Sequence, residues 1–199
     1  MSKPSRLILS VFFGLSFCFF STAEEKYFED NVLDSIIGLN LMAHVFNIGS
    51  ADEQILQNGS AESAGLRTGL LIEFTRLKKG YSVEGYVGSD NIRNYFGAKF
   101  NVFYPWIWNS FKILGGVGLG ATAGIPKDRS ITVETRFWEP HITPYARIMY
   151  EVNSWFAISG NAGLEIAPLR ASADGDPDVQ QGFRMKMYMG IGFLFGVDI

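Results

Sequence analysis

Few side chains of this chain could do chemistry, and the most suggestive group lies in one short segment. His141 is one of only two histidines, and it precedes Thr143 by two residues and Glu151 by ten. An imidazole, a hydroxyl and a carboxylate are the groups that activate a nucleophile for hydrolysis. The hydroxyl here belongs to a threonine followed by a proline instead of a serine, which weakens the case for a nucleophile. We therefore expect no enzymatic activity.

Three further patterns suggest a bound group, but none of them is specific. His44 and His141 with Glu139 would form a metal site, and the acidic run Asp174–Asp178 would bind a divalent cation. The run Gly115–Gly124 is rich in glycine like a dinucleotide-binding loop, but an alanine stands where the third glycine of that fingerprint belongs. No cysteine accompanies the histidines, and turn chemistry explains the acidic run. We expect no cofactor and no metal.

The elements that must position these side chains are visible at the end of the chain, where apolar and polar or small residues alternate. Apolar residues would share one face of a strand: Phe183, Met185, Met187, Met189, Ile191, Phe193, Phe195, Val197 and Ile199. The opposite face would carry Arg184, Lys186, Tyr188, Gly190, Gly192, Gly196 and Asp198, with Leu194 as the one exception. Successive side chains of a strand point to opposite faces, so this strand has one face suited to lipid.

Eight segments carry this alternation. They are 33–46, 64–77, 80–88, 92–104, 111–125, 140–152, 155–167 and 182–199. A strand that crosses a bilayer at the usual tilt needs roughly 9 to 11 residues, and these segments are about that long or longer. The pattern predicts an all-β fold, an eight-stranded antiparallel up-and-down transmembrane β-barrel.

The connections between these segments alternate in length. Three of them are long and polar: Asn47–Ser63, Pro126–Glu139 and Pro168–Gln181. The others are short: Lys78-Lys79, Ser89–Asn91, Pro105–Ser110 and Asn153-Ser154. Outer-membrane barrels have short periplasmic turns and longer external loops. We therefore expect the three long connections to be external and both ends of the barrel to be periplasmic.

The first residues have the order of a secretory signal peptide. Lys3 and Arg6 precede the apolar run Leu7–Phe20, and small residues up to Ala23 offer a cleavage site. The run has 14 residues, fewer than the roughly 18 of a spanning helix. We predict a signal peptide over 1–23, a short periplasmic segment over 24–32 and the barrel over 33–199. The only cysteine, Cys18, lies in the signal.

Charge and aromatic residues fit a barrel with a filled interior. Removing Lys3 and Arg6 takes the net charge from −3 to −5, which argues against a nucleic-acid partner. The inner faces would hold ten charged residues: Arg67, Glu73, Glu84, Lys99, Lys112, Arg147, Glu151, Glu165, Arg184 and Lys186. Buried charges must be paired, and eight strands leave an interior just wide enough for side chains, so we expect a salt-bridged plug.

Aromatic residues would form the periplasmic membrane interface: Tyr81, Tyr104, Trp106, Trp108, Trp155, Phe156, Phe193 and Phe195. Phe137 and Trp138 would lie at the external interface.

The terminal strand Phe193–Ile199 adds to the signal, the eight alternating segments and the loop lengths. In these four features the chain resembles the small outer-membrane barrels of the OmpA/OmpX type in Gram-negative bacteria. Such barrels usually end in an aromatic residue that the assembly machinery reads, and Ile199 takes that place here. The resemblance implies an outer-membrane location, contact with lipid and lipopolysaccharide, and insertion by the barrel-assembly machinery. It also implies external loops that serve envelope integrity, adhesion or host contact.

Three alternatives remain open from the sequence. A narrow channel for small solutes would use the same barrel with an open interior. A lipid A-modifying enzyme would place a nucleophile on the membrane-facing wall. A soluble lipocalin-like carrier would have eight strands with the reverse facing, so that apolar side chains point inward around a ligand and charges point outward.

Overall fold

The computed structural model describes residues 34–48, 67–90, 93–127, 136–172 and 179–197. The range 33–199 forms one compact unit. The predicted signal peptide, the segment 24–32 and most of the predicted loop Asn47–Ser63 lie outside the described residues. In the described part, no helix is long and apolar enough to cross a membrane.

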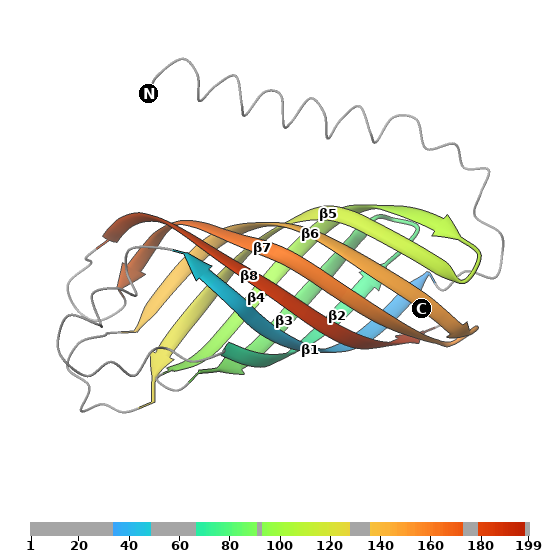
Figure 1. Ribbon diagram of the computed structural model, residues 1–199, viewed down its shortest axis with the longest axis horizontal. Coiled ribbons are helices and arrows are strands. Elements are labelled where there is room, and N and C mark those ends of the chain that lie inside the picture. Colours follow the sequence, from blue (N-terminus) through green and yellow to red (C-terminus); the bar gives the residue numbers. More distant parts are fainter. Residues whose placement is uncertain (1–33, 49–66, 91–92, 128–135, 173–178, 198–199) are drawn as a thin grey trace, which may run out of the picture. The chain divides into compact units, whose positions relative to one another are not determined.

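Eight strands form one closed sheet (Figure 1). They are β1 (Ser35–Ile48), β2 (Arg67–Arg76), β3 (Tyr81–Ser89), β4 (Arg93–Trp108), β5 (Phe111–Pro126), β6 (Phe137–Asn153), β7 (Phe156–Ser172) and β8 (Val179–Gly196). Each strand pairs antiparallel with its neighbours in sequence, and β1 pairs with β8 to close the barrel. The predicted eight-stranded up-and-down barrel is confirmed.

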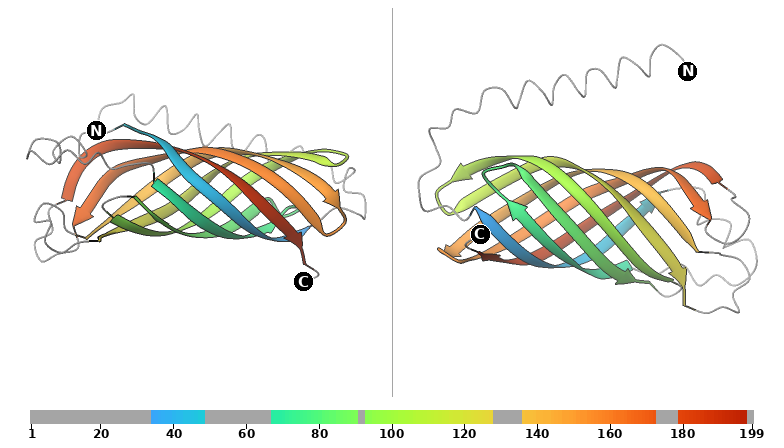
Figure 2. Two further views of the ribbon diagram at one scale, coloured as in Figure 1. Left: turned by 60° about the horizontal axis from the view of Figure 1, so that its bottom comes forward. Right: turned by 180° about the vertical axis from the view of Figure 1, so that it is seen from behind.

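The barrel has two ends of different character (Figure 2). Tight turns join β2 to β3, β4 to β5 and β6 to β7 at one end, which also holds the start of β1 and the end of β8. We call it the turn end. The opposite, loop end carries the connections 49–66, 90–92, 127–136 and 173–178. Two turn residues have positive φ angles, Gly80 (71°) and Asn109 (46°), and these residue types tolerate that conformation best.

At the turn end, β4 is longer than the sequence indicated. Pro105–Ser110 was predicted to be a connection, but β4 continues to Trp108 and pairs with β5 down to Phe111. Only Asn109 and Ser110 remain as the turn. The proline does not stop the strand, because here β4 extends beyond its pairing with β3, which ends at Val102.

At the loop end, all three long predicted loops are partly strand, and β1 extends into the first of them as far as Ile48. β6 begins at Phe137 inside the predicted loop Pro126–Glu139, while β7 ends at Ser172 and β8 begins at Val179 inside Pro168–Gln181. Pro140 and Pro168 lie at irregularities of the strand register instead of at strand ends. A bulge leaves one residue unpaired, so a proline there interrupts the ladder without ending it.

The facing of the side chains is that of a membrane barrel. Large apolar side chains stand on the outer wall, among them Leu41 (62% exposed), Leu119 (61%) and Ile191 (61%). Arginine, lysine and glutamate side chains are buried inside. A soluble carrier requires the reverse facing, so this arrangement argues against the lipocalin-like alternative.

Near the turn end the interior also holds a layer of apolar side chains, whereas we had expected a salt-bridged plug. The side chains there are almost fully buried: Ile36, Leu77, Phe103, Leu114, Met149, Ala157 and Leu194. They come from six strands and one turn. We call this set of buried side chains the apolar layer.

Candidate functional site

A network of four charged side chains crosses the middle of the interior. Arg147 on β6 binds Glu73 on β2 through both arms of its guanidinium, with Nη2–Oε2 at 2.6 Å and Nη1–Oε1 at 2.9 Å. Its Nη2 also lies 3.3 Å from Glu84 Oε1. Lys99 Nζ binds Glu84 Oε2 at 2.9 Å and donates to the Tyr188 hydroxyl at 3.1 Å. Every charge of this central network therefore has an opposite charge in contact.

The register of the strands brings three of these four side chains together. Glu73, Glu84 and Lys99 are direct neighbours on β2, β3 and β4, on the inner face of each strand. Two carboxylates in adjacent positions would repel each other. Arg147 relieves this repulsion from β6, which is four strands away from β2 in either direction around the barrel. The network thus ties opposite walls together across the interior.

A second cluster lies inside the loop end, around Glu139 on β6. Its carboxylate accepts from Arg170 Nε at 2.7 Å and binds Lys186 Nζ, and Arg184 Nε lies 3.7 Å away. The guanidinium of Arg170 also stacks over the ring of Phe137, 3.9 Å from its centroid. Phe137 is buried, so its predicted place at the external membrane interface is wrong; the adjacent Trp138 faces outward.

We missed Glu139 and Arg170 as interior residues because both lie beyond prolines, Pro140 and Pro168, at which we had ended the predicted strands. Alternation continued through Pro140 finds Glu139, which has the same parity as Arg147. It does not find Arg170, because the register shift between Ala167 and Leu169 changes which positions of β7 point inward.

Asp90 was missed because it lay in the predicted connection Ser89–Asn91. Arg93 was also missed, although it lies in the predicted segment 92–104 and has the inner-face parity of Lys99. Asp90 accepts from the Arg93 amide at 2.7 Å and from the Tyr95 hydroxyl.

The other predicted interior charges are placed as follows. At the turn end, Lys112 is fully buried and binds Glu151, whose side chain is 15% exposed. Near the loop end, the Glu165 carboxylate lies 3.3 Å from His44 Nε2. Arg67 is buried between two tyrosine rings. The ten predicted residues thus all point into the barrel, but they form separate clusters at different depths.

Three aromatic rings of the interior lie directly opposite glycines on the next strand. The register pairs are Tyr86 with Gly97, Tyr188 with Gly163 and Phe137 with Gly124. A Cβ atom at any of the three glycines would collide with the opposite ring; at Gly163 it would lie 2.6 Å from Tyr188 Cε1. Other glycines of the run Gly115–Gly124 also serve packing: Lys99, Asn101 and His141 fill the space beside Gly118 and Gly120.

The candidate catalytic and metal residues do not assemble into a site. His141 Nδ1 and Thr143 Oγ1 are 3.0 Å apart, but both side chains are buried in the interior and not on the membrane-facing wall. Glu151 lies at the turn end with Lys112. Within the described ranges, no group of three or more histidine, cysteine, aspartate or glutamate side chains could hold a metal ion. The acidic run Asp174–Asp178 lies outside them.

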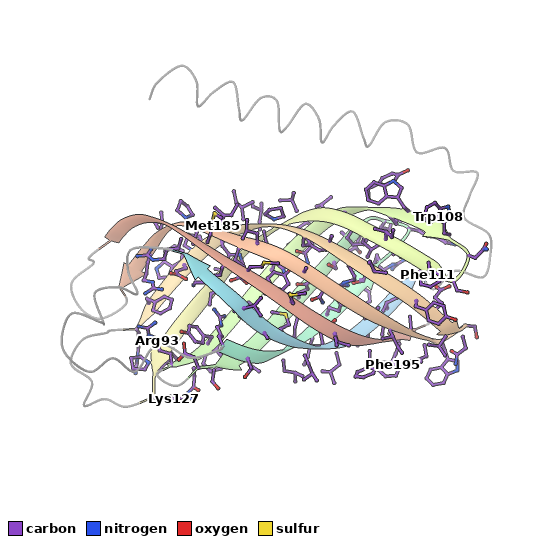
Figure 3. The ribbon with its side chains drawn as sticks, viewed as in Figure 1. Arg93, Trp108, Phe111, Lys127, Met185 and Phe195 are labelled. Atoms are coloured by element: carbon purple, nitrogen blue, oxygen red, sulfur yellow. The ribbon has the colours of Figure 1, made fainter. Side chains whose placement is uncertain are left out.

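Aromatic side chains gather on the outer wall near the turn end (Figure 3). Trp155, Phe156, Phe193 and Phe195 form one cluster with ring centroids 5.5–6.4 Å apart. The remaining predicted residues of this interface are also on the outer face: Tyr81 beside Phe100, Tyr104 beside Trp106, and Trp108, which is 75% exposed. The pair Phe111 and Tyr150, 4.9 Å apart, was not predicted.

No protein-family model matches the chain, and no curated protein matches its sequence. Among solved structures, it is similar to Neisserial surface protein A, with a TM-score of 0.52 and 8% identity over 81% of this chain and 97% of that one. It is also similar to the outer membrane protein OprG from Pseudomonas aeruginosa, with a TM-score of 0.50 and 13% identity over 84% of this chain and 97% of that one. The fold is that of a small outer-membrane β-barrel.

The likeness and the geometry agree. A barrel with apolar side chains outside, charges inside and aromatic residues near one rim is built to lie in a bilayer. The fold and the outer wall are therefore consistent with the predicted outer-membrane location.

Proposed function

We propose that this chain is an integral outer-membrane protein whose interior is closed and whose barrel displays external loops at the cell surface. The observation that carries this proposal is the central network, because Arg147 reaches both Glu73 and Glu84 across the interior. Ions that pass through such a barrel must displace these charge-assisted hydrogen bonds, which are among the strongest in proteins. The apolar layer adds a second closure at the turn end.

Conductance in planar bilayers tests the closed interior. The purified protein is expected to give no steady conductance, whereas a channel for small solutes gives discrete current steps. If the steps occur and change in E73A or R147A, the narrow channel replaces the plug as the function of the interior. A Trp108→Ala variant, which is altered on the outer wall, is the matched control for the E73A and R147A variants.

Trypsin tests the orientation with residues the chain already has. The connection between β5 and β6 offers Lys127, Arg129 and Arg136, and the turn between β2 and β3 offers Lys78 and Lys79. In intact cells we expect cleavage in the first set only, and cleavage at both in broken cells. If trypsin cleaves the protein in intact cells at Lys78 or Lys79 alone, the turn end is external and the proposed orientation is wrong. Migration that changes on heating in gel electrophoresis identifies the folded barrel in the same samples.

The loops carry the proposed role at the surface, which is envelope integrity, adhesion or contact with a host. Replacing 173–178 by a short Gly-Ser connection leaves all eight strands intact and removes three aspartates. If the loop contacts a host or matrix ligand, binding of cells to host cells is lost while the heat-dependent migration persists. A deletion strain that becomes sensitive to detergent, and is rescued by the loop-replaced protein, would assign envelope integrity to the barrel itself.

A further inference from the structure

Five methionines supply all the sulfur of the barrel range 33–199, which has no cysteine. Three of them alternate along β8, and the other two belong to β1 and β6. The three on β8 are Met185, Met187 and Met189; the others are Met42 and Met149. Any chemistry at sulfur in the barrel is therefore that of a thioether.

The three methionines of β8 stand on the outer wall, whereas the other two point into the interior. Met187 is 40% exposed, Met189 is 50% exposed and Met185 is partly exposed. Met42 is 6% exposed and Met149 is fully buried. We call the three outer residues the methionine row. The two inner methionines provide an internal comparison for it, because the same side chain occurs there in a closed environment.

The neighbours of Met189 leave half of its side chain uncovered. In the register of the sheet it lies between Ala43 on β1 and Ala162 on β7. Methionine is long and unbranched, and its sulfur is polarisable. An alanine methyl group on the adjacent strand is too short to cover that sulfur, so the thioether of Met189 faces the surroundings of the barrel wall.

The position of the methionine row along β8 determines what surrounds it. Phe195 belongs to the aromatic cluster near the turn end, and Met185 precedes it by ten positions. A tilted strand crosses the hydrocarbon region in roughly 9 to 11 residues. Met185 therefore lies near the external interface, toward the loop end (Figure 3), and Met187 and Met189 lie between the two interfaces. An oxidant that reaches these two sulfur atoms must dissolve in lipid.

We propose that the methionine row is an oxidation site for lipid-soluble organic hydroperoxides, and that sulfoxide formation at Met187 and Met189 destabilises the barrel. The thioether sulfur attacks the terminal oxygen of the hydroperoxide, so that an S–O bond forms and the O–O bond breaks. The proton of that oxygen passes to the departing alkoxide. The products are methionine sulfoxide and an alcohol: the sulfur is oxidised by two electrons and the peroxide is reduced.

The sulfoxide is less compatible with this environment than the thioether. Its oxygen is a hydrogen-bond acceptor, and lipid tails offer no donor. The change also falls beside the seam between β1 and β8, whose ladder has a register shift between His44 and Phe46. Oxidation is therefore expected to lower the stability of the folded barrel in lipid. This inference rests on the outer wall lying in lipid, and it is independent of the closed interior and of the loops.

The first experiment follows oxidation at each methionine. The purified protein, folded in vesicles of a saturated phosphatidylcholine, is treated with cumene hydroperoxide, and sulfoxide is measured by peptide mass spectrometry over time. We expect Met187 and Met189 to react at least about tenfold faster than Met42 and Met149, since oxidation follows exposure. In urea-unfolded protein all five should react at one rate. Equal rates in the folded protein, faster reaction of the inner pair, or no sulfoxide in the methionine row would overturn the proposal. Heat-dependent gel migration of the same samples separates a failure of folding from a failure of oxidation.

The second experiment measures the effect on stability. Urea titration in the same vesicles, with the folded fraction read from gel migration, should give a lower midpoint for the oxidised native protein than for the untreated one. M187L/M189L replaces both side chains by others of similar volume on the lipid-facing wall, so it should fold, and peroxide should leave its midpoint unchanged. The control M185L keeps Met187 and Met189 and should respond like the native protein. No fall in the oxidised native protein, or an equal fall in M187L/M189L, would refute the proposed destabilisation.

Discussion

Replacement of Arg147 by methionine should be among the most destabilising single changes in the barrel. The substitution keeps the volume and removes the guanidinium that contacts Glu73 at 2.6 and 2.9 Å. Glu84 keeps Lys99 at 2.9 Å, so the loss falls mainly on Glu73, which is left buried beside a second carboxylate. Removing one partner of a buried ion pair costs about 3–5 kcal/mol, and we expect R147M to lie in that range.

A double-mutant cycle isolates this cause. In R147M/E73Q the stranded charge is gone as well, so we expect most of the lost stability to return, with an interaction energy near the upper end of the ~0.5–3 kcal/mol range for contacting residues. Urea titration in lipid vesicles, with the folded fraction read from gel migration, measures all four proteins. The matched control R76M breaks a partly exposed pair and should cost about 0–1 kcal/mol. If R147M costs no more than this control, or the double variant recovers nothing, the central network does not stabilise the barrel.

Three more predictions concern side-chain packing and the membrane interface. Gly163→Ala forces the Tyr188 ring to move and should cost about 1–3 kcal/mol in urea titration, whereas Gly160→Ala on the same strand, with nothing within 4 Å of the added carbon, should be neutral; equal costs would contradict the packing argument. Leu194→Ala opens the apolar layer and should cost about 2–5 kcal/mol, more than Ile191→Ala on the lipid-facing side. The four tryptophans all face outward, so lipids brominated near the headgroup should quench their fluorescence more than lipids brominated at mid-chain; the opposite order would remove them from the membrane interface.

Alternation of side chains made most of the barrel wall predictable. Period two fixes which residues share a face, so the inner and outer residues of β3 or β8 follow from the sequence alone. The apolar layer also leaves a signal, namely pairs of adjacent apolar residues such as Ile113-Leu114 and Phe193-Leu194, where the second member must point inward. We treated Leu194 as an exception, although it marks this layer.

The contacts across the interior could not be predicted in the same way. Glu73 and Arg147 are 74 positions apart, and their meeting depends on the stagger of strands that are not neighbours. Alternation says that both point inward but not at what depth. The cluster around Glu139 was missed for another reason, because a proline was taken as the end of a strand where the barrel instead accommodates it at a bulge.

The pairing of β1 with β8 constrains the order in which the barrel assembles. The first and last strands are joined by a ladder from Ile36 opposite Gly196 to Ile48 opposite Met185, with one register shift between His44 and Phe46. Until that seam forms, the sheet is open and water reaches the lysines and glutamates of its concave side. Lys99 cannot meet Tyr188 before the final strand arrives. Assembly is therefore expected to be all-or-none, with the buried charges exchanging water for one another in its last step.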